Sequence, residues 1–146
     1  MNADDDLRDR LRLLTTQQQQ FERNLARRLA VDAAGLAAME HLVSEGPATP
    51  TELAHHLEIS TAATTLVVDR LAAAGHVTRE PHPNDGRKVI VRAAQRSAEA
   101  AYGHVALLLE RTAELDDSMS PAERATVTSF LDRIVEIYEE ANRALR

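Results

Sequence analysis

Apolar residues recur at alternating steps of four and three near both ends of the chain, which is the spacing of one face of an α-helix. The first stripe lies in residues 5–30 and the second in residues 121–146, and Gln18 is the one polar member of the first. The other members are Leu7, Leu11, Leu14, Phe21 and Leu25 in the first stripe, and Val127, Leu131, Ile134, Tyr138, Ala141 and Leu145 in the second. The pattern predicts a long amphipathic helix at each end of the chain, and Phe130 and Ile137 widen the second stripe.

Three shorter helices are predicted between these stripes, because a capping residue precedes each apolar run. Thr49 and Glu52 have the spacing of a capping box, and Pro50 suits the first helical position. The expected N-caps are Asp32, Thr49 and Ser60. The expected ends are Gly46, Leu57 and Ala74 followed by Gly75.

Residues 76–92 change from helical spacing to two short strands around a turn. The expected turn is the sequence PNDG at residues 83–86, in which every residue type favours a bend. Residues 89–91 are β-branched throughout, as in a strand. Arg87 and Lys88 follow the bend, where a hairpin tip projects from its domain. Two short helices followed by a basic hairpin are the layout of a winged helix-turn-helix, which reads nucleic acid.

The rest of the chain is predicted to be helical, with one helix over residues 95–115 and the last opened by a capping box of Ser120 and Glu123. The fold class is therefore mainly α with a small β-hairpin wing. We expect one compact domain, with an N-terminal dimerisation helix and second helix in 1–46, the winged helix-turn-helix in 47–94 and C-terminal dimerisation helices in 95–146. Packing of both terminal stripes within one chain is the alternative to a dimer.

Composition excludes several classes of protein. The chain has no cysteine, which excludes a disulfide framework, a thiol redox switch and a cysteine zinc site. Its acidic first residues lack the apolar segment of a secretory signal, and no apolar run has the length of a membrane span. We therefore expect a cytoplasmic protein with no membrane partner. No glycine-rich phosphate loop, nucleophile motif or pair of catalytic carboxylates is apparent, so we expect neither an enzyme nor a cofactor.

The net charge of −6 is unevenly distributed. Residues 1–46 and 97–146 carry net charges of −2 and −5, whereas residues 47–96 carry +1. Because phosphate binding needs a local basic face rather than a basic protein, the acidic total does not exclude DNA.

The stretch of residues 57–91 resembles the helix-turn-helix and wing of the MarR (multiple antibiotic resistance regulator) family. The shared features are the sequence DRL at 69–71, Gly75, Val77 and Arg79, and the wing motif Asp85-x-Arg87 before an apolar strand. The length of the chain and the order of its helices fit as well. The resemblance implies a homodimeric regulator of transcription that binds double-stranded DNA, usually a repressor. It also implies that a small, often aromatic effector releases the DNA by binding between the dimer helices and the reading domain.

The resemblance also implies roles for particular residues. The helix over residues 60–74 would enter the major groove with its N-terminal part leading. Arg87 would enter the minor groove, supported by a salt bridge from Asp85. The DNA-binding residues implied in this way are Ser60, Thr61, Ala62, Thr65, Arg70, Asp85, Arg87 and Lys88. The effector pocket implied is formed by Phe21, Met39, His41 and Tyr102, with packing in the core as the alternative for each.

The reading helix departs from the family at two positions. Leu66 stands where a basic or long polar residue is common, and Thr64 where an apolar core residue is usual. No Arg or Lys precedes Arg70 in this helix, so base specificity would come from hydroxyls, thymine-methyl contacts and DNA shape.

Several of these residues, and the chain as a whole, have a second interpretation. Ser60 and Thr49 act as helix caps with or without a contact to DNA, and Arg70 either contacts phosphate or pairs locally with Asp69. The six histidines include no pair at the His-x-x-x-His spacing, so no metal site is expected. The acidic charge and Leu66 also suit a winged-helix module that binds protein rather than DNA.

Overall fold

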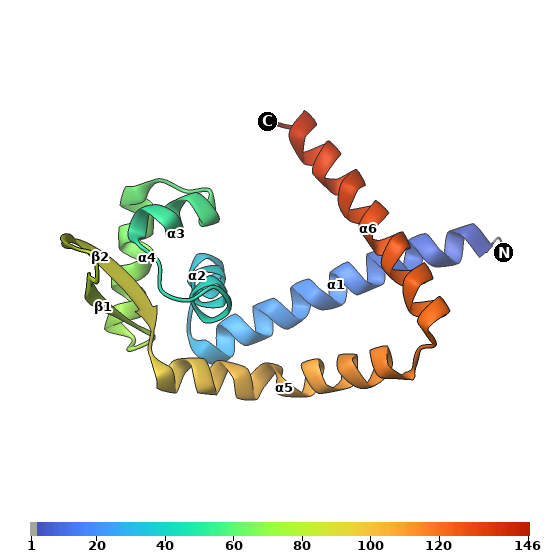
Figure 1. Ribbon diagram of the computed structural model, residues 1–146, viewed down its shortest axis with the longest axis horizontal. Helices are drawn as coiled ribbons and strands as arrows, with labels where there is room; N and C mark the ends of the chain where they lie inside the picture. Colours follow the sequence, from blue (N-terminus) through green and yellow to red (C-terminus); the bar gives the residue numbers. More distant parts are fainter. Residues whose placement is uncertain (1–2) are drawn as a thin grey trace. The chain divides into compact units, whose positions relative to one another are not determined.

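The computed structural model describes residues 3–146, and side-chain exposure from residue 7 onward. In this part of the chain the elements are helices and one antiparallel hairpin, so the predicted fold class is confirmed (Figure 1). The elements are α1 (Ala3–Leu29), α2 (Ala33–Ser44), α3 (Pro50–Leu57), α4 (Thr61–Ala73), β1 (Val77–His82), β2 (Asp85–Ala93), α5 (Gln95–Ser118) and α6 (Pro121–Ala144). None of the described helices is both long and apolar enough to cross a membrane.

The chain forms two compact units that divide within α5. The first extends to His104 and holds α1 to α4, the hairpin and the start of α5, while the second holds residues 105–146. The sequence predicted dimerisation segments in 1–46 and 95–146 and a DNA-binding segment in 47–94. These roles stay a prediction.

The core of the first unit is built where α2, α3, α4 and the hairpin meet. Leu53 of α3, Val68 of α4 and Val91 of β2 are its largest fully buried apolar side chains. Ala48 and Val91 exchange backbone hydrogen bonds of 3.0 and 2.7 Å, so the loop before α3 is joined to the hairpin. Thr64 is fully buried among these residues, and its hydroxyl donates to the carbonyl of Ser60 at 3.0 Å. A threonine is tolerated at this core position because its polar atom has a partner.

The predicted helix caps are confirmed. Asp32 accepts a hydrogen bond from the backbone of Gly35, and Ser60 accepts one from that of Ala63. Both halves of each predicted capping box are formed, by Thr49 with Glu52 and by Ser120 with Glu123. The helix predicted over residues 95–115 ends later than expected, at Ser118.

The capping box of α3 gives a prediction that depends on pH. Hydrogen bonds from the backbone and hydroxyl of Thr49 lower the pKa of Glu52 below its ordinary value of 4.5. Thr49→Ala should lower the free energy of unfolding by about 1 kcal/mol at neutral pH, measured by urea denaturation. A lowered carboxyl pKa contributes stability above its unfolded value and loses it as the pH falls through the folded value. The part of the difference that comes from the lost hydroxyl bond to Glu52 should therefore shrink below pH 4.5, because the backbone bond to Glu52 is kept in both proteins.

The neighbouring exposed Thr51 provides the control, since Thr51→Ala removes a similar side chain without touching the box. Equal losses in the two variants, or a Thr49→Ala loss that does not change with pH, would contradict this account of the cap.

The second unit has little apolar burial in one chain. No side chain of α5 or α6 is buried among the described residues. Arg124 closes the turn between the two helices, with its guanidinium 3.0 Å from a carboxylate oxygen of Asp116 and donating to the Asp116 carbonyl at 2.6 Å. The exposed large apolar side chains of these helices are Tyr102, Leu107, Leu108, Leu109, Leu115, Val127, Leu131, Val135, Ile137, Tyr138 and Leu145. In α1 likewise, Leu7 and Leu14 are exposed whereas Leu25 and Leu29 are buried.

Candidate nucleic-acid interface

One face of α4 is turned away from the core. Thr64, Val67, Val68 and Leu71 are buried, and the exposed side chains lie on the opposite face of the helix. The exposed residues of the first half of α4 are Thr61, Ala62, Thr65 and Leu66. No charged residue lies between Ile59 and Val68, so this face presents hydroxyl and methyl groups only.

The start of α4 has free hydrogen-bonding capacity of its own. The Ser60 hydroxyl accepts from the Ala63 backbone at 3.1 Å and remains able to donate, while the Thr65 hydroxyl donates to the Thr61 carbonyl at 3.0 Å. The N–H groups of the first turn of a helix carry a partial positive charge that attracts phosphate. Capping by Ser60 and contact with a ligand are therefore compatible.

The turn of the hairpin differs from the predicted one. It consists of Pro83 and Asn84 alone, because His82 already pairs with Asp85. Pro81 pairs with Val89, so residues 86–88 form a bulge on β2. The predicted PNDG turn was thus two residues too long, since strand pairing resumes at Asp85.

The bulge presents the two basic residues of the wing. Arg87 and Lys88 are both exposed. The carboxylate of Asp85 accepts a hydrogen bond from the backbone N–H of Arg87 at 3.1 Å. Among the described residues no ion pair joins the two side chains, so the salt bridge implied by the family was wrong in its detail: Asp85 shapes the backbone and leaves the guanidinium of Arg87 to project.

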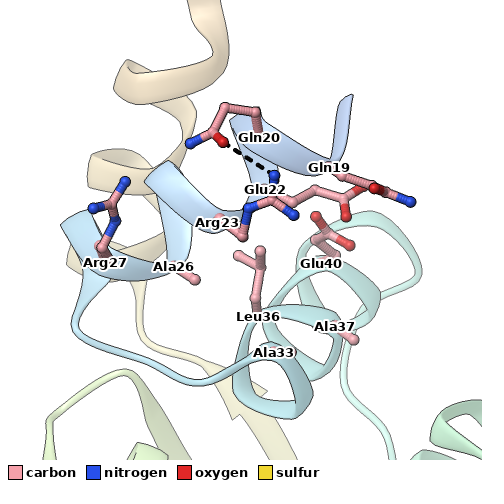
Figure 2. Close-up of a pocket in the computed structure, with 10 residues that line it drawn as sticks. All are labelled: Gln19, Gln20, Glu22, Arg23, Ala26, Arg27, Ala33, Leu36, Ala37 and Glu40. Carbon is pink, nitrogen blue, oxygen red and sulfur yellow. Dashed lines mark hydrogen bonds between the residues drawn. The ribbon is translucent and has the colours of Figure 1, made fainter. Parts of the chain in front are cut away.

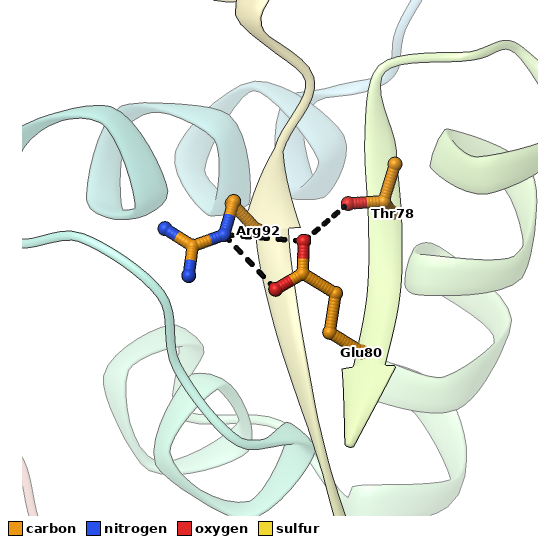
Figure 3. Close-up of polar contacts among 3 residues, drawn as sticks. All are labelled: Thr78, Glu80 and Arg92. Atoms are coloured by element: carbon orange, nitrogen blue, oxygen red, sulfur yellow. Dashed lines mark hydrogen bonds and ion pairs between the residues drawn. The ribbon is translucent and has the colours of Figure 1, made fainter. Parts of the chain in front are cut away.

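Ion pairs fix the hairpin to α4 and to itself. Arg79 of β1 donates to the carboxylate of Asp69 of α4, which ties the wing to the reading helix. Across the hairpin, Arg92 lies 3.2 Å from the carboxylate of Glu80, which also accepts from Thr78 at 3.5 Å (Figure 3). The Arg79–Asp69 pair thus links the wing to α4, and the other two contacts lie within the hairpin.

Arg70 pairs with Asp32 rather than with its neighbour Asp69. Its guanidinium donates to Asp32 at 2.7 Å, and Asp69 pairs with Arg79, so the local Asp69–Arg70 pair is not formed. The other carboxylate oxygen of Asp32 caps α2. Asp32 therefore joins the start of α2 to the last turn of α4, and this pair competes with phosphate for Arg70.

His76 holds the base of the hairpin, a role that the sequence did not predict. One ring nitrogen lies 2.8 Å from the Leu29 carbonyl at the end of α1, and the other lies 3.1 Å from the Ser97 hydroxyl of α5. The Ser97 hydroxyl in turn lies 3.3 Å from the Gly75 carbonyl. These partners are remote in sequence, so no local pattern signals the contact.

An open cavity of 690 Å³ lies between α1 and α2 (Figure 2). Leu36 points from α2 toward α1 across it, and Arg23 of α1 donates to Gln20 at 3.0 Å beside it. Burial, and then the charge of Glu22, raises the pKa of Glu40 at its rim. The lining residues are Gln19, Gln20, Glu22, Arg23, Ala26, Arg27, Ala33, Leu36, Ala37 and Glu40.

None of the four residues expected to form an effector pocket lines this cavity. Met39 belongs to the core, Phe21 and His41 are half-buried, and Tyr102 is exposed. Met39 is thus a core residue, which was the alternative to a pocket role, because it lies on the inner face of α2.

The histidines of α2 and α3 approach each other. The rings of His41 and His56 lie 4.2 Å apart between centroids and are tilted by 35°. Over the residues that the structure describes, no three histidine, aspartate or glutamate side chains converge as metal ligands would.

Comparison with known proteins places this geometry in a family. A sequence model of the MarR family matches residues 34–89, which cover α2 from its second residue, α3, α4 and most of the hairpin. An uncharacterized HTH-type transcriptional regulator of Bacillus subtilis, YcgE, is 31% identical over 92% of this chain and 88% of its own.

The chain belongs to the MarR family.

Members of this family are transcriptional regulators and not enzymes. Solved structures agree in fold. The chain is similar to RV1404 from Mycobacterium tuberculosis, with a TM-score of 0.69 and 22% identity over 93% of this chain and 94% of that one. It is also similar to a mutant of MarR from E. coli in complex with operator DNA, with a TM-score of 0.53 and 26% identity over 92% of this chain and 99% of that one.

Proposed function

We propose that this MarR-family regulator is a homodimeric repressor that binds a pseudo-palindromic DNA operator in the cytoplasm. The observation that carries the proposal is the pairing of α4 with the wing through Asp69 and Arg79. It combines an exposed, uncharged helix face with an exposed basic hairpin tip in one unit. A major-groove helix and a minor-groove arginine need such a fixed relation. The related MarR structure in complex with operator DNA supports DNA as the ligand.

Each part of this surface has a proposed role. The start of α4 enters the major groove, where Ser60, Thr61, Ala62 and Thr65 face phosphate or base edges. At the wing, Arg87 enters the minor groove, Lys88 contacts phosphate and Asp85 holds the bulge. Arg70 contributes charge near the backbone while it is paired with Asp32.

Exposed apolar side chains support the homodimer. Leu131 and Tyr138 of α6 are exposed, and Leu7 and Leu14 continue the same kind of stripe in α1. Apolar surface of this extent on a regular helix face is typical of an interface between subunits. A two-fold dimer would present two copies of α4 to two half-sites about one turn of DNA apart.

The cavity between α1 and α2 supports the proposal of a small aromatic effector. Its volume of 690 Å³ is in the range of ligand pockets, and Leu36 offers an apolar contact beside Arg23, which suits an aromatic acid. One lining residue, Ala33, directly follows Asp32, whose carboxylate pairs with Arg70 of the reading helix. An effector that moved α1 against the start of α2 would therefore reach α4 through the Asp32–Arg70 pair.

A protein-binding module without DNA affinity is the second candidate. The net charge of −6 and the exposed Leu66 favour it. A module of this kind has no need of an exposed Arg87 on a shaped bulge.

Selection of bound sequences from random double-stranded DNA tests the function, followed by a salt titration of binding to the selected site. We expect an inverted repeat and an affinity that falls steeply with salt, because bound phosphates release counterions. Failure to enrich any sequence, together with negligible binding at low salt, would overturn the proposal in favour of the protein-binding module.

A further inference from the structure

Leu66 is an apolar side chain placed on the outer face of α4. It is 61% exposed, whereas Val67, Val68 and Leu71 of the same helix are at most 4% exposed. It therefore contributes little to the core of the unit. Its apolar side chain is therefore available for contact with a ligand of α4, and such a contact would be stabilised by removing apolar surface from water.

The surroundings of Leu66 restrict what this ligand can be. The neighbours on the exposed face are Ala62 and Thr65, and the next charged side chain along the helix, Asp69, is paired with Arg79. The nearest cation on this face, Arg70, lies one turn after Leu66 and is paired with Asp32, so no unpaired cation is next to Leu66 to bind a phosphate. A side chain with hydroxyl and methyl neighbours instead suits the edge of a base, which offers hydrogen-bonding groups and, on thymine, a methyl group.

We infer that Leu66 is a specificity-determining residue that recognises the C5-methyl group of thymine in the major groove. The inference rests on the proposed function, since it requires α4 to enter that groove. Leu66 is close to the middle of α4, one turn after Ala62, so its side chain can follow the leading turn of the helix into the groove. Each half-site should then contain a thymine that cannot be replaced without loss of affinity.

The test uses deoxyuridine, which differs from thymidine only by lacking this methyl group. The selected operator is synthesised with each thymine of the half-site replaced in turn, and binding by the parent and by Leu66→Ala is measured at constant salt. For the parent, one position per half-site should show about a fourfold loss, the value of one buried methyl group. Substitution in both half-sites should give about a fifteenfold loss if the two are independent.

The Leu66→Ala variant should bind the thymine operator more weakly and show no further loss at that position. Val43→Ala provides the control, since Val43 is also exposed but lies on α2, and it should keep the full sensitivity to deoxyuridine. Leu66 lies outside the core, so the variant should fold as the parent does, which its thermal unfolding verifies.

The outcomes distinguish failure of the proposed function from failure of the proposed role of Leu66. If the parent binds no DNA, the proposed function fails. If the parent binds its operator but deoxyuridine has no effect, or has the same effect in Leu66→Ala, the function stands and the role of Leu66 is refuted. Retained DNA affinity with loss of a bound protein partner in Leu66→Ala would also refute it, in favour of a protein contact.

Discussion

Replacing Leu131 by Asp should dissociate the homodimer into monomers that no longer bind the operator. Leu131 is 44% exposed in one chain and lies on the same face of α6 as Ile134 and Tyr138. If this face meets its copy across a two-fold axis, the variant buries two carboxylates without partners. Each uncompensated charge costs about 3–5 kcal/mol, which weakens association more than roughly 100-fold. Sedimentation velocity at micromolar concentration measures the change in mass.

A matched variant separates charge from position. Ser129 is exposed on the opposite face of α6, so Ser129→Asp adds the same charge away from the apolar stripe and should remain dimeric. Loss of operator binding should accompany loss of the dimer, because one half-site supplies only part of the binding energy. A parent that sediments as a monomer, or a Leu131→Asp protein that stays dimeric, would contradict this dimer interface. The terminal helices would then pack within one chain.

The elements of this fold were predictable because their signals are local. Thr49 and Glu52 are three residues apart, and the capping box they form follows from that spacing alone. The apolar steps of α1 and α6 are likewise read from short windows. The hairpin followed from its turn residues, but its register did not, because the bulge at 86–88 depends on which strand residues pair.

The partners of the site residues could not be predicted in the same way. A local pair with Asp69 was one of two alternatives for Arg70, yet its guanidinium reaches Asp32, 38 residues earlier. His76 contacts Leu29, which is 47 residues away. Such pairs form only once α1, α2 and α4 have packed, so the sequence supplies the charged groups without saying which will meet. The family resemblance identified the wing but implied a salt bridge between the side chains of Asp85 and Arg87. In the structure Asp85 accepts from the backbone N–H of Arg87 instead, since motif positions do not determine hydrogen bonds.

Removing the wing arginine should cause the second large loss of operator affinity. Arg87→Ala should weaken operator binding by about 1–3 kcal/mol for each wing, the value of one groove contact. The loss follows from the structure of the tip, where Arg87 is exposed on a bulge and its backbone is held by Asp85. Fluorescence anisotropy with a labelled operator measures the affinity, and thermal unfolding should be unchanged because the side chain is not part of the core.

Asp85 and Lys88 make the prediction specific. Asp85→Ala should weaken binding less, and its effect should be non-additive with Arg87→Ala, because Asp85 acts on the same bulge. Lys88→Ala should weaken binding to all sequences alike and lower the salt dependence, as expected for a phosphate contact. If Arg87→Ala and Lys88→Ala give the same small loss on every sequence, both residues act only through charge. An Arg87→Ala protein with parental affinity at moderate salt would remove the wing from the reading of DNA altogether and leave recognition to α4.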